Sequence, residues 1–221
     1  SSKKIQQNCF YKESMFHVYS IDYLWVVQSK DGGRTWEHPR DITDQIKRPA
    51  STGEGAILVS PGKGIVTSEG DSVIGIYNTL NNESASMLYT KDGKTWKRTQ
   101  DVQNRRTKTS ENEIVELKDG TLRMFYRSNN GKISYADITK DENEDYVMGS
   151  EVETDVNAVS NCNVSVISYS EEIEGKQMLL VSCPGSGSGS LTGMSRANGK
   201  IFVFLVDDSD PANTMTLYHT F

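Results

Sequence analysis

The fold of this chain is decided by one short stretch, Ser29-Lys30-Asp31-Gly32-Gly33-Arg34-Thr35-Trp36. It fits the pattern Ser-x-Asp-x-Gly-x-Thr-Trp at every fixed position, and residues 90–96 (Thr-Lys-Asp-Gly-Lys-Thr-Trp) repeat it with one residue fewer. Each copy follows a short segment, 25–28 or 86–89, that we expect to be a strand. In such a hairpin the aspartate accepts backbone N–H bonds across the turn, glycine supplies a positive φ, and the tryptophan packs back between strands. The two copies therefore predict repeated β-hairpins of one design.

The rest of the chain also has strand periodicity. Short apolar runs rich in β-branched and aromatic residues are bounded by Asp-Gly, Asn-Gly and Pro-Gly turn signals. These runs are 23–27, 73–77, 122–126, 177–181 and 200–206. No stretch sustains an amphipathic helix, so we predict an all-β chain, either a sandwich, a barrel or a propeller.

Two segments are predicted to lie outside this strand pattern. Residues 184–192 (Pro-Gly-Ser-Gly-Ser-Gly-Ser-Leu-Thr) have the composition of a flexible surface loop. The acidic run 141–145 is typical of a solvated turn.

Composition excludes several classes of function. The net charge of −6 argues against nucleic acid as a partner, because a phosphate-binding surface needs an excess of lysine and arginine. No apolar run is long enough for a membrane span, and residues 1–7 have no signal-peptide character. The three cysteines, Cys9, Cys162 and Cys183, follow no metal-ligand spacing, and their odd number argues against a disulfide framework. We expect no metal and no cofactor, and one domain is the default for 221 residues.

The two turn motifs are Asp-boxes, which mark β-propeller blades in sialidases. Other segments resemble successive pieces of large bacterial sialidases, and the resemblance covers nearly the whole chain in order. These segments are 10–14, 61–65 and 164–170. The resemblance implies a six-bladed β-propeller of the sialidase type, of which residues 1–221 supply the middle and later blades of the catalytic domain.

The same resemblance singles out three residues. In bacterial sialidases a glutamate opens one strand and an arginine closes the next, a pattern that residues 110–127 match with Glu111 and Arg127. Glu111 would then be the base that partners a tyrosine nucleophile, and Arg127 one of three arginines that bind the substrate carboxylate. Arg196, in the segment 195–201, resembles another of these arginines.

Neighbouring charged residues receive structural interpretations instead. Strand alternation places Glu113 on the same face as Glu111 and Glu116 on the opposite face. Arg123 lies on the same strand face as Arg127, and we interpret it as a rim or surface residue.

Sialic-acid chemistry explains the residue types. The sugar carries a carboxylate on its anomeric carbon, which planar arginine forks bind in a bidentate manner. That carboxylate would repel a carboxylate nucleophile, hence the tyrosine. A phenol with an ordinary pKa of about 10 needs a base at neutral pH, the role proposed for Glu111.

Part of the family's catalytic set has no counterpart here. The sequence lacks the Arg-Ile-Pro-like arginine and the acid/base aspartate that shortly follows it in sialidases. Tyr218, the last tyrosine, does not match the context of the nucleophile. Either a flanking segment or a second chain would complete the propeller, and the chain alone is expected to be inactive.

The sequence therefore favours an exo-α-sialidase that releases terminal α-linked sialic acids from glycoproteins, glycolipids or oligosaccharides with retention, in a secreted or cell-surface bacterial protein. One alternative is an intramolecular trans-sialidase or lyase-like enzyme that yields anhydro or unsaturated sialic acid. An alternative of another class is a non-catalytic Asp-box propeller that binds glycans or proteins. Glu111 beside Arg127 favours an enzyme, because a binding module needs no base.

Overall fold

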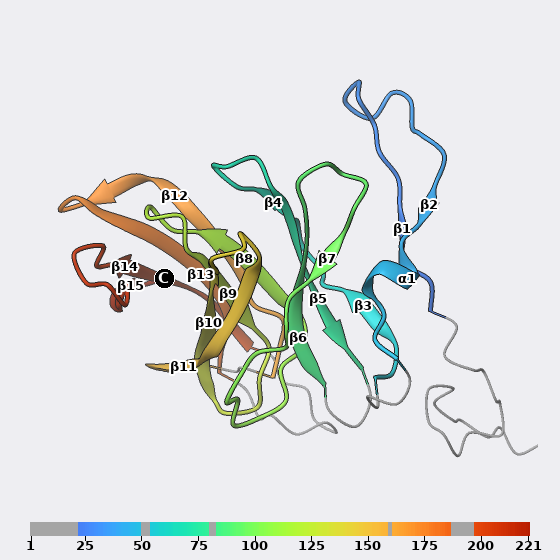
Figure 1. The fold of residues 1–221 in the computed structure, drawn as a ribbon. Helices are drawn as coiled ribbons and strands as arrows, with labels where there is room; N and C mark the ends of the chain where they lie inside the picture. Colours follow the sequence, from blue (N-terminus) through green and yellow to red (C-terminus); the bar gives the residue numbers. More distant parts are fainter. Residues whose placement is uncertain (1–21, 50–53, 80–82, 159–160, 187–196) are drawn as a thin grey trace, which may run out of the picture.

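The computed structural model describes residues 22–49, 54–79, 83–158, 161–186 and 197–221 (Figure 1). Within these ranges the chain forms four antiparallel sheets, which follow one another along the sequence. The one helix among them, α1 (Thr43–Ile46), has four residues, so no described helix has the length or apolar character of a membrane span. The prediction of an all-β chain is confirmed.

The first sheet pairs β1 (Trp25–Val26) with β2 (Arg40–Asp41). In the second, β3 (Ile57–Val59) and β4 (Ile65–Val66) both pair with β5 (Ser72–Asn78), followed by β6 (Ser84–Thr90) and β7 (Lys97–Arg98). The third consists of β8 (Asn112–Glu116), β9 (Leu122–Tyr126), β10 (Lys132–Lys140) and β11 (Tyr146–Asn157). The fourth consists of β12 (Ser165–Ile173), β13 (Lys176–Ser186), β14 (Ala197–Val206) and β15 (Met215–Thr220). In the last two sheets the spatial order of the strands equals their order in the chain.

The predicted loop 184–192 is wrong at its beginning, because β13 continues to Ser186. Pro184 pairs with Gly199 of β14, whereas the pairing of β13 with β12 starts only at Ser182. Beyond Ser182 one edge of β13 therefore needs no ladder donors, and a proline without an N–H is tolerated there. Residues 187–192 lie outside the described residues.

The sheets lie side by side in chain order (Figure 1). Three clusters of apolar side chains join each sheet to the next. Between the first and second sheets lie Leu24, Ile42, Ile46, Ile57, Ile76 and Leu88. Between the second and third lie Val73, Ala85, Met87, Tyr89, Val102, Ile114, Leu122, Met124, Tyr126, Ala136, Ile138, Tyr146 and Met148. Between the third and fourth lie Val115, Leu117, Phe125, Ile133, Tyr135, Val164, Val166, Leu179, Val181, Cys183, Phe202, Phe204 and Val206. Sheets that pack face to face in succession are the arrangement of propeller blades.

The third sheet is covered on both faces. In β9, Leu122, Met124 and Tyr126 face the second sheet, whereas Phe125 faces the fourth. All five residues of the strand are consequently buried. This explains why β9 reads as a nearly continuous apolar run rather than as an alternation.

Arg123 corrects the interpretation of this residue as rim or surface: its side chain is 0% exposed. It lies on the face of β9 that the fourth sheet covers, and its cross-strand partner on β10 is Asp137. Its Nε and Nη2 donate to the two oxygens of Asp137, each at 2.7 Å, and Nη1 donates to the carbonyl of Asn213 at 2.9 Å. The guanidinium also lies over the Tyr135 ring, 4.0 Å from its centroid. A buried charge persists here because it is fully paired.

The turn of the first Asp-box, 29–36, has the aspartate bonds and the glycine conformation that its sequence predicts. The Asp31 carboxylate accepts backbone N–H bonds from Arg34 (3.0 Å) and Thr35 (2.9 Å). Gly33 has φ of 86°, in the region that favours glycine. The backbone and hydroxyl bonds from Thr35, with one from Ser29, lower the pKa of Asp31 to about 2.

The shorter Asp-box, 90–96, repeats this design. Asp92 accepts backbone N–H bonds from Lys94 and Thr95, both at 2.7 Å, and these bonds, that from Thr95 first, lower its pKa. The expected tryptophan packing holds for Trp96, which lies against the cluster between the first and second sheets. It is wrong for Trp36, which is 61% exposed and whose ring Nε1–H donates to the Gly33 carbonyl of its own turn at 3.1 Å.

The corresponding turns of the third and fourth sheets also use aspartate, although they lack the motif. Asp141 accepts the backbone N–H groups of Asn143 and Asp145 between β10 and β11. Asp207 accepts that of Ser209 between β14 and β15. The run 141–145 is thus the exposed turn that its composition predicts, although Asp145 also accepts bonds from Tyr89 and Lys97.

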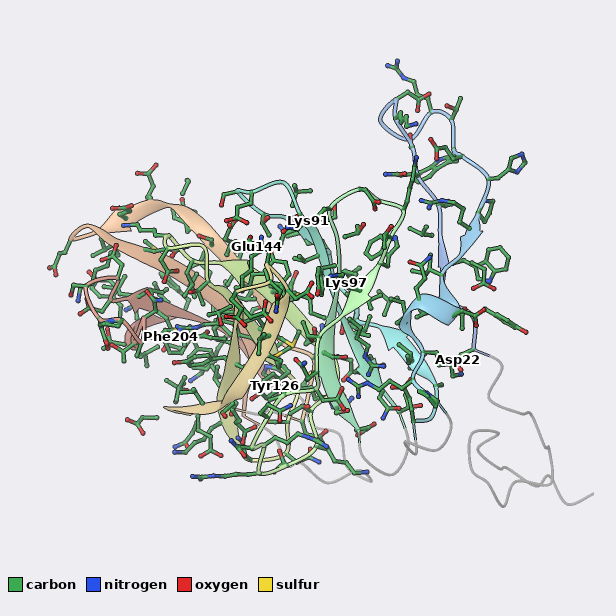
Figure 2. The ribbon with its side chains drawn as sticks, in the orientation of Figure 1. Asp22, Lys91, Lys97, Tyr126, Glu144 and Phe204 are labelled. Carbon is green, nitrogen blue, oxygen red and sulfur yellow. The ribbon has the colours of Figure 1, made fainter. Side chains whose placement is uncertain are left out.

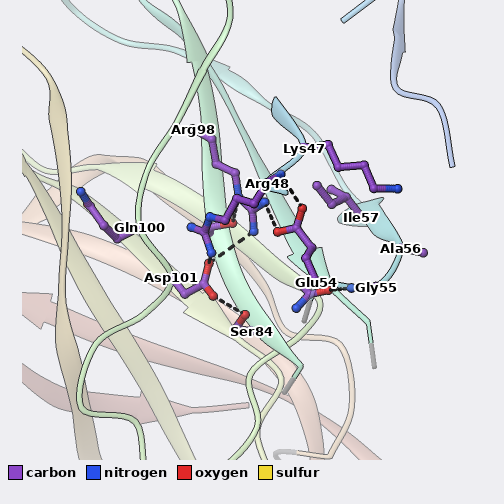
Figure 3. Close-up of polar contacts among 12 residues, drawn as sticks. Lys47, Arg48, Glu54, Gly55, Ala56, Ile57, Ser84, Arg98, Gln100 and Asp101 are labelled. Atoms are coloured by element: carbon purple, nitrogen blue, oxygen red, sulfur yellow. Dashed lines mark hydrogen bonds and ion pairs between the residues drawn. The ribbon is translucent and has the colours of Figure 1, made fainter. Parts of the chain in front are cut away.

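A buried ion-pair network fixes the chain as it enters the second sheet (Figure 3). The side chains of Arg98 and Glu54 are only 4% and 2% exposed and pair at 2.5 Å. Asp101 bridges Arg98 and Arg48, at 3.3 and 2.9 Å, and accepts from the Ser84 hydroxyl. The network ties residues 48 and 54, before β3, to the ends of β6 and β7.

Candidate functional site

Glu111 and Arg127 lie directly opposite each other, one residue before β8 and one residue after β9. The Arg127 N–H donates to the Glu111 carbonyl at 2.7 Å, which extends the ladder beyond the last strand pair, Asn112 with Tyr126. Side chains of such cross-strand neighbours share one face of the sheet. Accordingly, Nη1 of Arg127 lies 3.1 and 2.9 Å from the two Glu111 oxygens. The two side chains remain 28% and 21% exposed, so solvent reaches the pair.

Asn161 holds the other side of the same guanidinium. Its Oδ1 accepts from Nε of Arg127 at 3.0 Å and from Nη2 at 2.8 Å. Asn161 lies between β11 and β12, on the connection from the third to the fourth sheet. Arg127 is therefore positioned both by the third sheet and by the connection that leads to the fourth.

Tyr77 on β5 brings a phenol into this environment. Its pKa is raised, first by burial and then by the negative charges of Glu111 and Glu83, with Arg127 acting in the opposite direction. At neutral pH the phenol is therefore a protonated hydrogen-bond donor beside an acidic side chain. A tyrosine with a raised pKa suits a binding role better than a nucleophilic one.

The start of β8 is anchored to both neighbouring sheets. The backbone N–H of Asn112 donates to the Ser60 hydroxyl at 3.1 Å, and its side-chain amide donates to the Ile76 carbonyl at 3.0 Å. Glu113 is buried and accepts from the Ser165 hydroxyl at 2.7 Å and the Val166 N–H at 2.9 Å. Glu113 thus joins β8 to β12, which agrees with its interpretation as a structural residue.

The site and the Asp-boxes lie at opposite ends of the sheets. Tyr126, which precedes Arg127, lies at one end, whereas Lys91 and Glu144 lie in turns at the other (Figure 2). Glu116 belongs to that second end, where its carboxylate accepts the N–H and hydroxyl of Ser68. The Asp-boxes therefore build the scaffold away from the candidate site.

Of the three predicted site residues, the structure brings Glu111 and Arg127 together. Arg196 lies outside the described residues; β14 begins at the next residue, Ala197, which pairs with Ser186. Tyr218 on β15 is 57% exposed. Sequence reasoning missed Tyr77, which comes from the second sheet, and Asn161, which lies on the connection from the third to the fourth sheet, because neither belongs to a motif. Across the described ranges, no group of three His, Cys, Asp or Glu side chains is arranged to hold a metal ion.

Comparison with known proteins identifies the family. Residues 9–212 match the BNR repeat-like domain. The chain is 29% identical to an anhydrosialidase from Macrobdella decora over 93% of its length, and 30% identical to sialidase B from Streptococcus pneumoniae over 95%. It covers only 26% and 28% of those two relatives.

Solved structures agree in fold. The NanB sialidase from Streptococcus pneumoniae matches all of the chain with a TM-score of 0.69 at 25% identity, and the chain covers 32% of it. A leech intramolecular trans-sialidase matches 99% of the chain with a TM-score of 0.69 at 26% identity, and the chain covers 31% of it. The successive sheets are accordingly blades, and the chain belongs to the BNR repeat-like family and is similar to part of the β-propeller of sialidases.

Proposed function

We propose that the chain is part of an exo-α-sialidase that releases terminal α-linked sialic acids from glycoconjugates with retention of configuration. The observation that carries the proposal is the contact of Arg127 with Glu111 at a solvent-accessible end of the sheets. It places a carboxylate-binding cation beside a candidate base. Membership of the sialidase family supports the same assignment.

Arg127 suits a carboxylate ligand because it offers paired donors in one plane. An arginine fork binds a carboxylate through two parallel N–H···O bonds, which are stronger than bonds between neutral groups. In the proposed complex Arg127 and Arg196 bind the sugar carboxylate. The phenol of Tyr77 is a further donor for substrate hydroxyls near the pair.

Glu111 would act on a tyrosine that lies outside this chain. As that phenol attacks the anomeric carbon, Glu111 takes its proton, and the bond to the leaving sugar breaks as an acid protonates the departing oxygen. Water then attacks the anomeric carbon from the opposite side and gives its proton to the conjugate base of the acid, while the sialyl–tyrosine bond breaks and Glu111 returns its proton to the phenol oxygen. Two successive inversions give retention.

A second candidate differs only in the last step. In an intramolecular trans-sialidase a hydroxyl of the sugar itself replaces water, and the product is an anhydro sugar. The relatives favour this possibility, because one is an anhydrosialidase and a leech structure holds 2,7-anhydro-Neu5Ac after soaking with 3′-sialyllactose. We further propose that the enzyme acts outside the cell, where sialylated glycoproteins and glycolipids are exposed.

The test uses the full-length polypeptide that contains this chain, incubated with 3′-sialyllactose. Mass spectrometry distinguishes free sialic acid from the anhydro product, which lacks one water. We expect Arg127→Ala and Glu111→Gln to abolish release, while Asn143→Ala, in the exposed turn at the far end, keeps it. Release by Arg127→Ala at the unmutated rate would overturn the assignment, and sialic-acid binding without turnover in the unmutated protein would indicate a binding module.

A further inference from the structure

The Arg127 guanidinium is divided between two acceptors of different charge. Asn161, a neutral amide, takes the edge formed by Nε and Nη2, whereas the Glu111 carboxylate faces Nη1. A guanidinium has five N–H donors in a fixed plane. The third edge, formed by Nη1 and Nη2, is bridged by no acceptor among the described residues. This is the edge that can bind a carboxylate with two parallel bonds.

We infer that Asn161 is a positioning residue that orients Arg127 so that this edge stays available for a carboxylate. The inference rests on the proposed function and deepens it, because it concerns the same anionic ligand. Without Asn161, Nε and Nη2 would lose their acceptor in a side chain that is only 28% exposed. The nearest remaining acceptor is Glu111, and a bidentate pair with Glu111 would occupy both the arginine fork and the base.

The neutrality of the amide matters as much as its position. Arg127 and Glu111 together carry no net charge, so a carboxylate at position 161 would give this group of three side chains a net negative charge. Such a site would repel the carboxylate of the ligand. An asparagine satisfies the same two donors as an aspartate would, without adding that charge. The residue type is therefore explained by the ligand and not only by the arginine.

Asn161 also explains how the site depends on the assembled propeller. It lies 34 residues from Arg127 in sequence, on the connection that leads into the fourth sheet. Glu113 ties the same region to β8 through Ser165 and Val166. Arg127 thus has its orientation set only when the third and fourth sheets are packed together.

The experiment compares Asn161→Ala and Asn161→Asp with the unmutated full-length protein and with Asn143→Ala as the matched control. For release from a sialoside, we expect Asn161→Ala to raise KM roughly 10- to 100-fold, the equivalent of one hydrogen bond to a charged group, with a smaller change in kcat. We expect Asn161→Asp to raise KM further than Asn161→Ala does at neutral pH.

A binding measurement isolates the carboxylate. Sialic acid and its methyl ester are titrated separately, and Asn161→Ala should weaken binding of the acid but leave that of the ester unchanged. A merely structural role would weaken both equally, and that result, or an unchanged KM, would overturn the inference. Circular dichroism shows whether Asn161→Ala folds. If it does not, the same binding comparison is made with Asn161→Asp, which has nearly the same shape, and a loss of acid binding without a loss of ester binding supports the inference. If the unmutated protein binds the acid but releases no sugar, the proposed function fails while the binding comparison still tests Asn161.

Discussion

The buried pair of Arg123 and Asp137 leads to a prediction about asymmetric stability. Arg123 is 0% exposed, whereas Asp137 is 28% exposed. Asp137→Ala removes both bidentate bonds and leaves an uncompensated cation that water cannot reach. Stranding a buried charge in this way costs about 3–5 kcal/mol of unfolding free energy.

The reciprocal change should cost less. Arg123→Met keeps most of the side-chain volume, and the remaining Asp137 is exposed enough to be hydrated. The main loss is then the hydrogen bond that Arg123 donates to the carbonyl of Asn213. Leaving that buried carbonyl without its donor costs about 1–3 kcal/mol of unfolding free energy. We therefore expect Asp137→Ala to be the more damaging single change.

The assay is urea denaturation of the two single variants and the double variant. For each variant the slope of unfolding free energy against urea concentration is compared with that of the unmutated protein, because a changed slope would mean a changed denatured state. Once Arg123→Met is present, adding Asp137→Ala should cost little, because no cation remains to be stranded. The double variant should thus be more stable than the sum of the single effects predicts. Strictly additive losses, or a greater loss from Arg123→Met, would refute the reasoning.

Three further predictions follow from local geometry. Gly75→Ala should strongly destabilise the protein, because the added Cβ would lie 1.8 Å from the buried Asn112 Oδ1. The control is Gly199→Ala, whose Cβ meets nothing within 4 Å and should be tolerated. The midpoints of thermal unfolding compare the two variants. The pKa of Asp31 in the folded protein, about 2, lies below its ordinary value of 3.8. The ionised carboxylate therefore stabilises the fold above pH 3.8, and this contribution is lost as the pH falls towards 2. We expect Asp31→Asn to make the unfolding free energy, measured by denaturation at each pH, fall less steeply below about pH 4. Burial raises the pKa of the Cys183 thiol to about 12, so iodoacetamide at pH 8 should leave this thiol unmodified until urea is added, and mass spectrometry of peptides would reveal any exception.

The sequence was sufficient wherever the determining contacts are local. In the first Asp-box, Asp31 binds groups no more than four residues away, so the motif itself specifies the turn. Glu111 and Arg127 are 16 residues apart on two strands joined by one tight turn. Their register follows from the hairpin, and so the resemblance could place both residues.

Only the tertiary structure could decide what lies across from a strand. Alternation correctly put Arg123 on the face of Arg127, but the packing of the fourth sheet buries the first and leaves the second at an open end. Trp36 and Trp96 have the same motif, but Trp96 packs against the cluster between the first and second sheets whereas Trp36 is 61% exposed. Asn161 reaches Arg127 from the connection between the third and fourth sheets, 34 residues away in sequence, and no local pattern encodes such a contact. The alternation of side chains along a strand and the residue types of a turn are properties of residues that are neighbours in sequence. Burial and the pairing of charges depend instead on which sheets pack together.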